Sequence, residues 1–117
     1  IEVMLLTDID RRAIDCARWN IADPRARFAW ADVRDLPLDG PPFDAVIMNP
    51  PFHDAGHEDR ALGQAFIRRA AELLCRGGKA YLVANRHLPY ESVLASAFAS
   101  VRPLAEGDGF KIYEAIR

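Results

Sequence analysis

The strongest constraint on the fold of this chain is an alternation of short apolar segments with segments of helical periodicity. Residues 2–7, 27–31, 45–48 and 79–84 are each short and apolar and are followed by a polar residue, so we predict four buried strands. Helical periodicity separates the first strand from the second and the third from the fourth. This alternation predicts a parallel α/β sheet with helices on both faces.

Two helices are marked by apolar stripes and by residues that start or stop a helix. Asp10 is the candidate N-cap of the first helix, and Asp23-Pro24 stops it. Gly77-Gly78 is expected to end the second. The apolar stripes consist of Ile14, Ala17 and Ile21 in the first helix and of Leu62, Phe66, Ala70 and Leu73 or Leu74 in the second.

The C-terminal part of the chain departs from strict alternation. A short helix is predicted over residues 90–99, and residues 101–105 and 110–116 are typical of a hairpin that turns at residues 107–109. The predicted sheet is therefore mostly parallel, with a C-terminal antiparallel hairpin. Because the chain has 117 residues and no linker or internal repeat, we expect a single domain over residues 1–117.

Charge and cysteine content narrow the possible partners and compartment. Fifteen basic residues oppose seventeen acidic ones, so the chain lacks the electrostatic footprint of nucleic-acid or membrane-surface binding, although a separate region can supply that charge. No apolar run approaches the roughly 20 residues that span a bilayer. Cys16 and Cys75 occupy apolar positions of predicted helices without metal-type spacing, so we expect reduced core thiols and a cytoplasmic location.

Polar residues follow all four predicted parallel strands. In such sheets ligands bind beyond the carboxyl ends of the strands. Asp8 can accept two hydrogen bonds from a ribose diol, and Asp32 can accept one from the exocyclic amine of an adenine. For either acid taken alone, a role in a turn or a helix cap is the commoner explanation, but Asp10 is the better cap candidate, so Asp8 is assigned the functional role. The four strand-end residues are Asp8, Asp32, Asn49 and Asn85.

Asn49-Pro50-Pro51-Phe52 is the most specific motif of the chain. Two prolines directly after an apolar strand donate no backbone hydrogen bonds, so they end the ladder and hold the backbone rigid. The Asn49 side-chain oxygen and the Pro50 carbonyl then form two close acceptors for an exocyclic NH2 group. Such acceptors stabilise the positive charge that develops when nitrogen attacks a methyl sulfonium, and Phe52 offers a face for stacking. The alternative is a proline-terminated strand with Asn as a turn residue.

These residues resemble motif IV of the class I S-adenosylmethionine (SAM)-dependent methyltransferases that modify exocyclic or amide nitrogens. VIMNPPF carries the resemblance, and LLTDID with the following helix to Asn20 is similar to their second motif. NPPFHDAG, RGGKAYLVAN, HLPYESVL and GFKIYEAIR together resemble the ribosomal RNA guanine-N2 methyltransferases of the small-subunit type C and large-subunit type G group. The resemblance covers essentially the whole chain and implies a Rossmann-like methyltransferase sheet.

The resemblance also implies a role for each motif residue. Asp8 would contact the ribose of SAM, and Asp32 with the backbone of Val33 would contact its adenine. Asn49 and Pro50 would hold the target amine during a direct, in-line methyl transfer without a covalent intermediate. The implied cofactor-binding residues are Asp8, Ile9, Asp32, Val33 and Asn49, and the implied catalytic residues are Asn49, Pro50, Pro51 and Phe52, which stacks on guanine. Because of their place near the expected pocket, His53 is expected to help position the base, and Arg86 and Tyr90 are candidate contacts to substrate phosphate or base. A solvated loop explains Arg86 and Tyr90 equally well.

One departure from the family pattern concerns the first strand and its glycine-rich loop, which cradles the methionine part of SAM. Neither is found in this chain, because the G-x-G sequence at residues 107–109 belongs to the predicted hairpin turn. The chain begins at Ile1 inside an apolar strand, so we expect a piece of a longer protein whose upstream part completes the fold between the strand ending at Asp8 and the one ending at Asn49. The piece alone would bind SAM weakly or not at all.

Other residues receive structural interpretations. His53 and His57 have helical i, i+4 spacing, but they follow two prolines and lack a third ligand, so no metal is expected. Trp19 and Trp30 are expected to be packing residues, and Lys111 is expected to be exposed.

Three functions remain open from the sequence. The first is methylation of guanine N2 in ribosomal RNA or a ribosomal subunit. The second keeps the enzyme class but changes the acceptor to adenine N6 or a protein glutamine amide, whose enzymes more often carry Tyr at the position of Phe52. The third is a degenerate, SAM-free half that binds RNA or has a structural role, which the intact motif and both acids argue against.

Overall fold

The computed structural model describes residues 1–54 and 57–117, which divide into two compact units. Unit 1 comprises Ile1–Pro37 and unit 2 comprises Leu38–Arg117. That both belong to a single domain stays a prediction.

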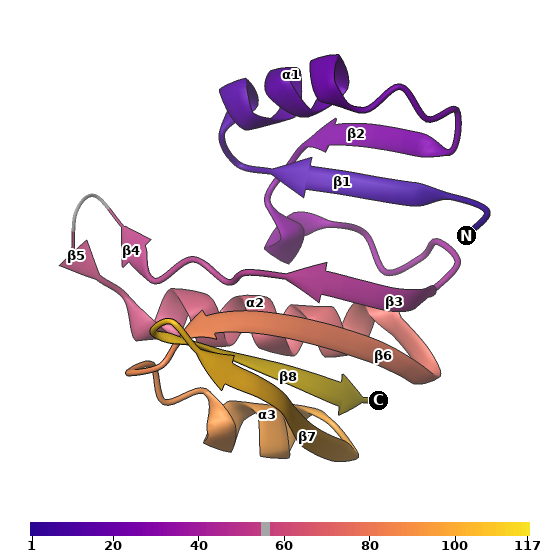
Figure 1. Ribbon diagram of the computed structural model, residues 1–117. Coiled ribbons are helices and arrows are strands. Elements are labelled where there is room, and N and C mark those ends of the chain that lie inside the picture. The colour runs from indigo at the N-terminus through magenta and orange to yellow at the C-terminus, as the bar shows by residue number, and fades with distance from the viewer. Residues whose placement is uncertain (55–56) are drawn as a thin grey trace. The chain divides into compact units, whose positions relative to one another are not determined.

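Unit 1 consists of two parallel strands covered by a helix (Figure 1). β1 (Met4–Asp8) pairs with β2 (Ala26–Trp30), so that Asp8 lies opposite Trp30 at the carboxyl ends of both strands. α1 (Arg11–Asn20) begins where the Asp10 side chain accepts a hydrogen bond from the Arg12 N–H at 2.9 Å, which confirms Asp10 as the N-cap. A 3-10 helix, η1 (Val33–Asp35), follows β2.

Unit 2 contains a four-stranded sheet in the order β3-β6-β8-β7. β3 and β6 are parallel, and β8 is antiparallel to both β6 and β7. The C-terminal hairpin is confirmed, and its turn places Asp108 and Gly109 at φ values of 53° and 81°, where glycine is favoured. The elements are β3 (Phe43–Met48), β4 (His53–Asp54), β5 (His57–Glu58), α2 (Arg60–Leu73), β6 (Leu74–Asn85), α3 (Glu91–Ala97), β7 (Ser100–Gly107) and β8 (Phe110–Ile116).

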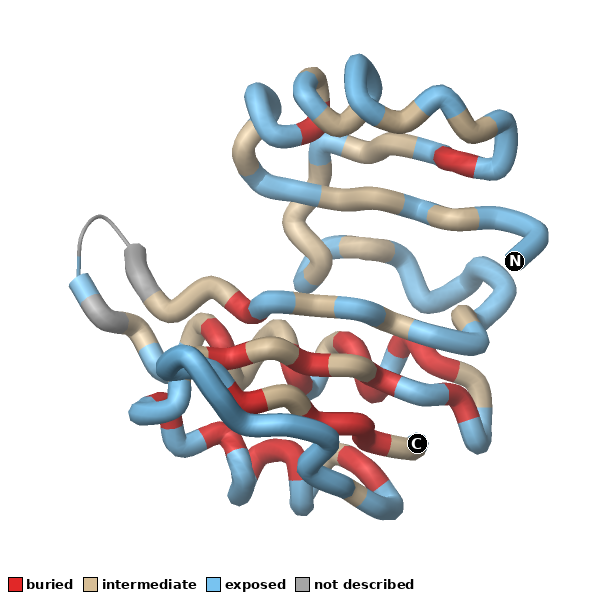
Figure 2. Tube along the Cα trace, in the orientation of Figure 1, coloured by how far each residue is buried: buried red, intermediate tan, exposed pale blue. Residues whose placement is uncertain are grey.

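The core of unit 2 lies between this sheet and the helices α2 and α3, where buried segments gather in Figure 2. Ile67 of α2, Leu82 of β6 and Leu94 of α3 are each almost fully buried. Ala70 and Leu73 of the predicted α2 stripe are buried as expected, but the prediction was wrong at Phe66, because Ile67 occupies the buried face there. The helix also ends earlier than predicted, since Leu74 already begins β6.

Several expectations about individual side chains were wrong. Cys16 is exposed on α1, and Cys75 lies in β6 rather than in a helix. Trp19 and Trp30 are 85% and 64% exposed, so neither is a core packing residue. The segment after the double proline contains a short antiparallel pair, β4 with β5, instead of a loop alone.

Helix length and polarity bear on membrane insertion. Over the described residues, every helix is too short or too polar to cross a bilayer.

Candidate functional site

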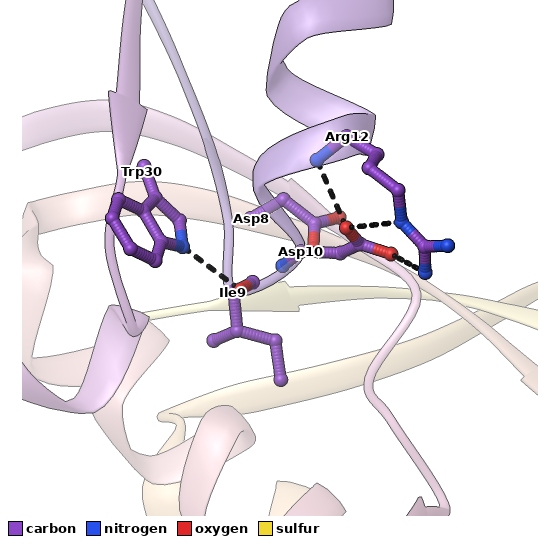
Figure 3. Close-up of polar contacts among 5 residues, drawn as sticks. All are labelled: Asp8, Ile9, Asp10, Arg12 and Trp30. Atoms are coloured by element: carbon purple, nitrogen blue, oxygen red, sulfur yellow. Dashed lines mark hydrogen bonds and ion pairs between the residues drawn. The ribbon is translucent and has the colours of Figure 1, made fainter.

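Asp8 stands exposed at the carboxyl end of β1, where the predicted ribose contact would be made. One carboxylate oxygen accepts a hydrogen bond from the Asp10 N–H at 2.7 Å, which fixes its orientation (Figure 3). Capping of α1 is performed by Asp10, whose carboxylate also binds the Arg12 guanidinium at 2.8 Å. Asp8 is therefore accessible to a ligand, and it does not cap α1.

Trp30 contributes a contact that sequence reasoning missed. Its indole Nε1 donates a hydrogen bond to the Ile9 carbonyl at 3.0 Å, as Figure 3 shows. The Arg11 guanidinium lies 5.8 Å from the centre of the Trp30 ring, within cation–π range. Trp30 thus fixes the backbone of Ile9, a predicted cofactor-binding residue. The only signal in the sequence was a tryptophan at the end of a short strand, next to Ala31 and Asp32.

Asp32 caps η1 and also forms an ion pair. Its carboxylate accepts from the Arg34 N–H at 2.9 Å and from the Arg34 guanidinium at 2.5 Å. The side-chain hydrogen bond from Arg34 lowers the pKa of Asp32, so this carboxylate stays ionised as an acceptor. Val33 is the first residue of η1, and the N–H of such a residue has no partner within its helix. Asp32 and Val33 therefore offer an acceptor and a donor to a base edge.

The Asn49–Phe52 motif follows β3 directly and forms the second candidate region, within unit 2. Asn49 is exposed, whereas Pro50 is fully buried and anchors the backbone below it. The four motif residues line a surface hollow of about 230 Å³. This volume is below the roughly 300–1,000 Å³ of enclosed small-molecule pockets. A hollow of this size can hold a single planar group of a larger substrate, while the rest of that substrate stays outside.

Phe52 is held by contacts on two sides. Its carbonyl accepts a hydrogen bond from the Asp59 N–H at 2.8 Å, which ties the motif to the start of α2. Its ring meets the His87 ring edge to face, with centroids 6.4 Å apart and an interplanar angle of 85°. The Phe52 side chain also packs against the buried core cluster of unit 2. An oriented, half-buried ring of this kind is suited to stacking.

The three predicted substrate contacts differ in their surroundings. Arg86 is exposed and forms a 2.7 Å surface ion pair with Glu106, so its guanidinium remains accessible to a phosphate. Tyr90 is 0% exposed, which argues against direct contact with a substrate. The backbone of His53 pairs with Glu58 in the β4–β5 hairpin, and its side chain lies outside what the structure describes. Among the described side chains, no group of three or more His, Cys, Asp or Glu forms a metal site.

Lys111, expected to be exposed, is instead buried in β8. Its ammonium binds the Glu91 carboxylate at 2.6 Å, and the Tyr113 hydroxyl donates to the same oxygen at 2.6 Å. Burial raises the pKa of Glu91, but the hydrogen bonds from Lys111 and Tyr113 together outweigh burial and hold that pKa below 4.5. Burial and the hydrogen bond to Glu91 raise the pKa of Tyr113 to about 12. The cluster joins the start of α3 to β8.

This cluster predicts a pH dependence of stability. Because the folded-state pKa of Glu91 is depressed, its stabilisation is present above pH 4.5 and is lost as pH falls through the lower folded value. The contribution of Tyr113 is present below pH 10 and is lost as pH rises through about 12. We expect Glu91→Gln to remove part of the acid sensitivity, measured as the free energy of unfolding against pH. The exposed Glu2→Gln is the matched control, and identical acid curves for wild type and Glu91→Gln would contradict the prediction.

The sequence is similar to a known protein family and to proteins of named function. The profile of the methyltransferase small domain matches residues 1–114. The ribosomal RNA small subunit methyltransferase C of Pseudomonas aeruginosa strain LESB58 is 38% identical over 117 residues, covering 97% of this chain and 34% of that protein. The enzyme of the same name from Hahella chejuensis is 44% identical over 77 residues, covering 66% of this chain and 22% of that protein. The chain thus spans about a third of the length of the Pseudomonas aeruginosa enzyme and less of the Hahella chejuensis enzyme.

Solved structures give the same fold. The T. thermophilus 16S rRNA N2 G1207 methyltransferase, determined with AdoMet and guanosine, superposes with a TM-score of 0.80 at 27% identity and covers 98% of this chain and 31% of that one. The N-methyltransferase NodS of Bradyrhizobium japonicum with S-adenosyl-L-homocysteine superposes with a TM-score of 0.70, covering 98% and 66%, but at 14% identity it supports the fold alone. The predicted α/β methyltransferase fold is therefore confirmed.

Proposed function

Because the chain belongs to the methyltransferase small-domain family, we propose that its protein is a SAM-dependent methyltransferase acting on the exocyclic N2 of a guanine in ribosomal RNA. The observation that carries the proposal is the Asn49–Phe52 hollow, in which an exposed amide precedes a double-proline segment anchored by the buried Pro50, beside an oriented aromatic ring. The names of the related proteins, small-subunit ribosomal RNA methyltransferases, support the same acceptor. A ribosomal substrate also supports the expected cytoplasmic location.

The residues of unit 1 fit the nucleoside part of SAM. The exposed, oriented carboxylate of Asp8 can accept hydrogen bonds from both hydroxyls of a ribose. The adjacent Ile9 has its backbone held by the hydrogen bond from the Trp30 indole. Asp32 can accept from the adenine amine, sharing its carboxylate with Arg34, and the Val33 N–H can donate to the ring. When bound, SAM supplies the electrophilic methyl group. These roles are proposals for Asp8, Ile9, Asp32 and Val33.

The Asn49–Phe52 motif would act on the acceptor. We propose that the Asn49 side-chain oxygen and the Pro50 carbonyl accept the two hydrogens of the guanine amine, while Phe52 stacks on the base. The nitrogen lone pair forms the new N–C bond as the methyl–sulfur bond breaks toward sulfur, and the positive charge moves onto nitrogen. The two oxygens stabilise that charge until a proton leaves the nitrogen. Pro51 contributes rigidity, and Arg86 can contact an RNA phosphate.

The upstream part of the protein is proposed to supply the first strand and the glycine-rich loop of the SAM site. The share of its relatives that the chain covers leaves room for such a region. We expect the 117-residue chain alone to bind SAM weakly or not at all, and the protein at full native length to bind it well. Calorimetry on both, with circular dichroism to confirm folding, measures the difference. Tight binding by the 117-residue chain would contradict the prediction.

The class of acceptor is tested with labelled SAM. The full-length protein is incubated with ribosomal subunits that lack its modification, and RNA and protein fractions are then counted. The proposal predicts label in RNA. Label in a ribosomal protein would favour a glutamine amide acceptor, and failure of the full-length protein to bind SAM would support the degenerate, non-enzymatic alternative.

A further inference from the structure

The start of α2 and the Tyr90 ring meet directly beneath the Asn49–Phe52 motif. A Cβ added to Gly63 would overlap the Tyr90 hydroxyl, would lie 2.6 Å from Tyr90 Cζ, and would lie 3.0 Å from the Pro51 carbonyl oxygen. Real Cβ contacts below 3.0 Å essentially do not occur, so only glycine permits this approach. Gly63 and Tyr90 are both buried, which makes the contact a fixed part of the interior of unit 2.

Gly63 is itself placed by the capping of α2. The Asp59 side chain accepts a hydrogen bond from the Leu62 N–H at 3.0 Å, and the Asp59 N–H donates to the Phe52 carbonyl at 2.8 Å. One residue therefore starts the helix and binds the motif. Gly63, at the end of the first turn of α2, presents a bare backbone to the Pro51 carbonyl. The motif and the first turn of α2 are thus held in one arrangement.

Tyr90 is placed from the other side, by α3 and β8. Its N–H donates to the Leu88 carbonyl at 3.0 Å, and its own carbonyl accepts from the Leu94 N–H at 3.0 Å. The adjacent Glu91 is bound by both Lys111 and Tyr113 of β8. The phenol therefore reaches Gly63 from a backbone that is fixed at several points.

We propose that Gly63 and Tyr90 are positioning residues that set the motif backbone for methyl transfer. This inference rests on the proposed function, in which Asn49 and Pro50 hold the amine. Pro51 follows Pro50 directly, so a shift of the Pro51 carbonyl also turns the Pro50 carbonyl away from the amine. Displacing catalytic acceptors by about 1 Å costs on the order of 10²-fold in rate. The burial of Tyr90 assigns it this indirect role in place of the predicted substrate contact.

The test compares variants of the full-length protein by kcat, by KM for RNA and by the Kd of SAM. Gly63→Ala is expected to lower kcat on the order of 10²-fold while the Kd of SAM stays near wild type. Tyr90→Phe, which keeps the ring and the fold, is expected to lower kcat by a smaller factor. Gly40→Ala is the matched control, because a Cβ at this exposed glycine meets nothing within 4 Å.

A double-mutant cycle separates positioning from general destabilisation. Tyr90→Leu shortens the side chain, so Gly63→Ala is expected to cost much less kcat in that background than in wild type. A folded Gly63→Ala protein with wild-type kcat, or equal costs in both backgrounds, would overturn the inference. If Gly63→Ala does not fold, wild-type kcat in Tyr90→Phe overturns it instead. Absence of methyl transfer by the wild-type protein overturns the proposed function and, with it, the positioning role.

Discussion

Asn49→Ala is expected to lower kcat on the order of 10²–10³-fold, because it removes one of the two oxygens that stabilise the developing positive charge. Asn49 is exposed, so the change should leave the fold and the stability of the protein intact. The Pro50 carbonyl remains in place and accounts for the residual activity. Steady-state transfer of labelled methyl groups to ribosomal subunits, by the full-length protein, gives both kcat and KM.

The Asn49→Ala experiment needs a control variant. The control must distinguish loss of the Asn49 contact to the amine from the general effect of removing an exposed polar side chain. Asp39→Ala changes a polar, exposed loop residue of the same unit and should leave kcat unchanged. A kcat close to wild type for Asn49→Ala would show that the amide does not act on the amine. A rise in KM alone would make Asn49 a binding residue, because uniform binding does not affect kcat.

Asp8→Ala is expected to raise the Kd of SAM on the order of 10²-fold or more. Each hydrogen bond to a charged group contributes about 1.5–3 kcal/mol, and Asp8 is proposed to accept two from the ribose. Every 1.4 kcal/mol corresponds to roughly a tenfold change in Kd. Isothermal titration calorimetry on the full-length protein measures the change directly.

The neighbouring acid Asp10 gives the Asp8 experiment an internal control. Asp10 caps α1, so Asp10→Ala should lower stability by about 1 kcal/mol and leave the Kd of SAM near wild type. Asp8→Ala should show the reverse pattern, because within the described part of the chain its carboxylate accepts a single hydrogen bond, from the Asp10 N–H. Equal losses of SAM affinity in both variants would mean that Asp8 acts through the structure of the turn.

The order of the secondary structure could be predicted from local sequence. Apolar runs located β1, β2, β3 and half of β6, and a Gly-Asp-Gly turn located the hairpin of β7 and β8. The end of α2 and its buried face at residues 66–67 differ from the prediction. Phe66 and Ile67 are adjacent and both apolar, so helical periodicity alone could not show which of the two side chains faces the core. The end of α2 was missed because Leu74 continues the apolar pattern while its backbone is already extended.

The supporting contacts of the candidate site could not be predicted, because they join residues far apart in the chain. Tyr90 was predicted to contact the substrate, and its approach to Gly63 shows that it belongs beneath the motif. Lys111 lies 20 residues from its partner Glu91, so local pattern suggested exposure. The motif itself was found because its chemistry is local: a strand followed by two prolines and an aromatic residue.

The most direct test of the amine clamp is to identify the methylated nucleoside. RNA from ribosomal subunits treated with the full-length protein and labelled SAM is digested to nucleosides and resolved by chromatography with mass spectrometry. The clamp at Asn49 and Pro50, with Phe52 stacked on the base, predicts label in N2-methylguanosine and its loss in Asn49→Ala. Label in N6-methyladenosine, or in N2-methylguanosine at an undiminished rate in Asn49→Ala, would contradict it.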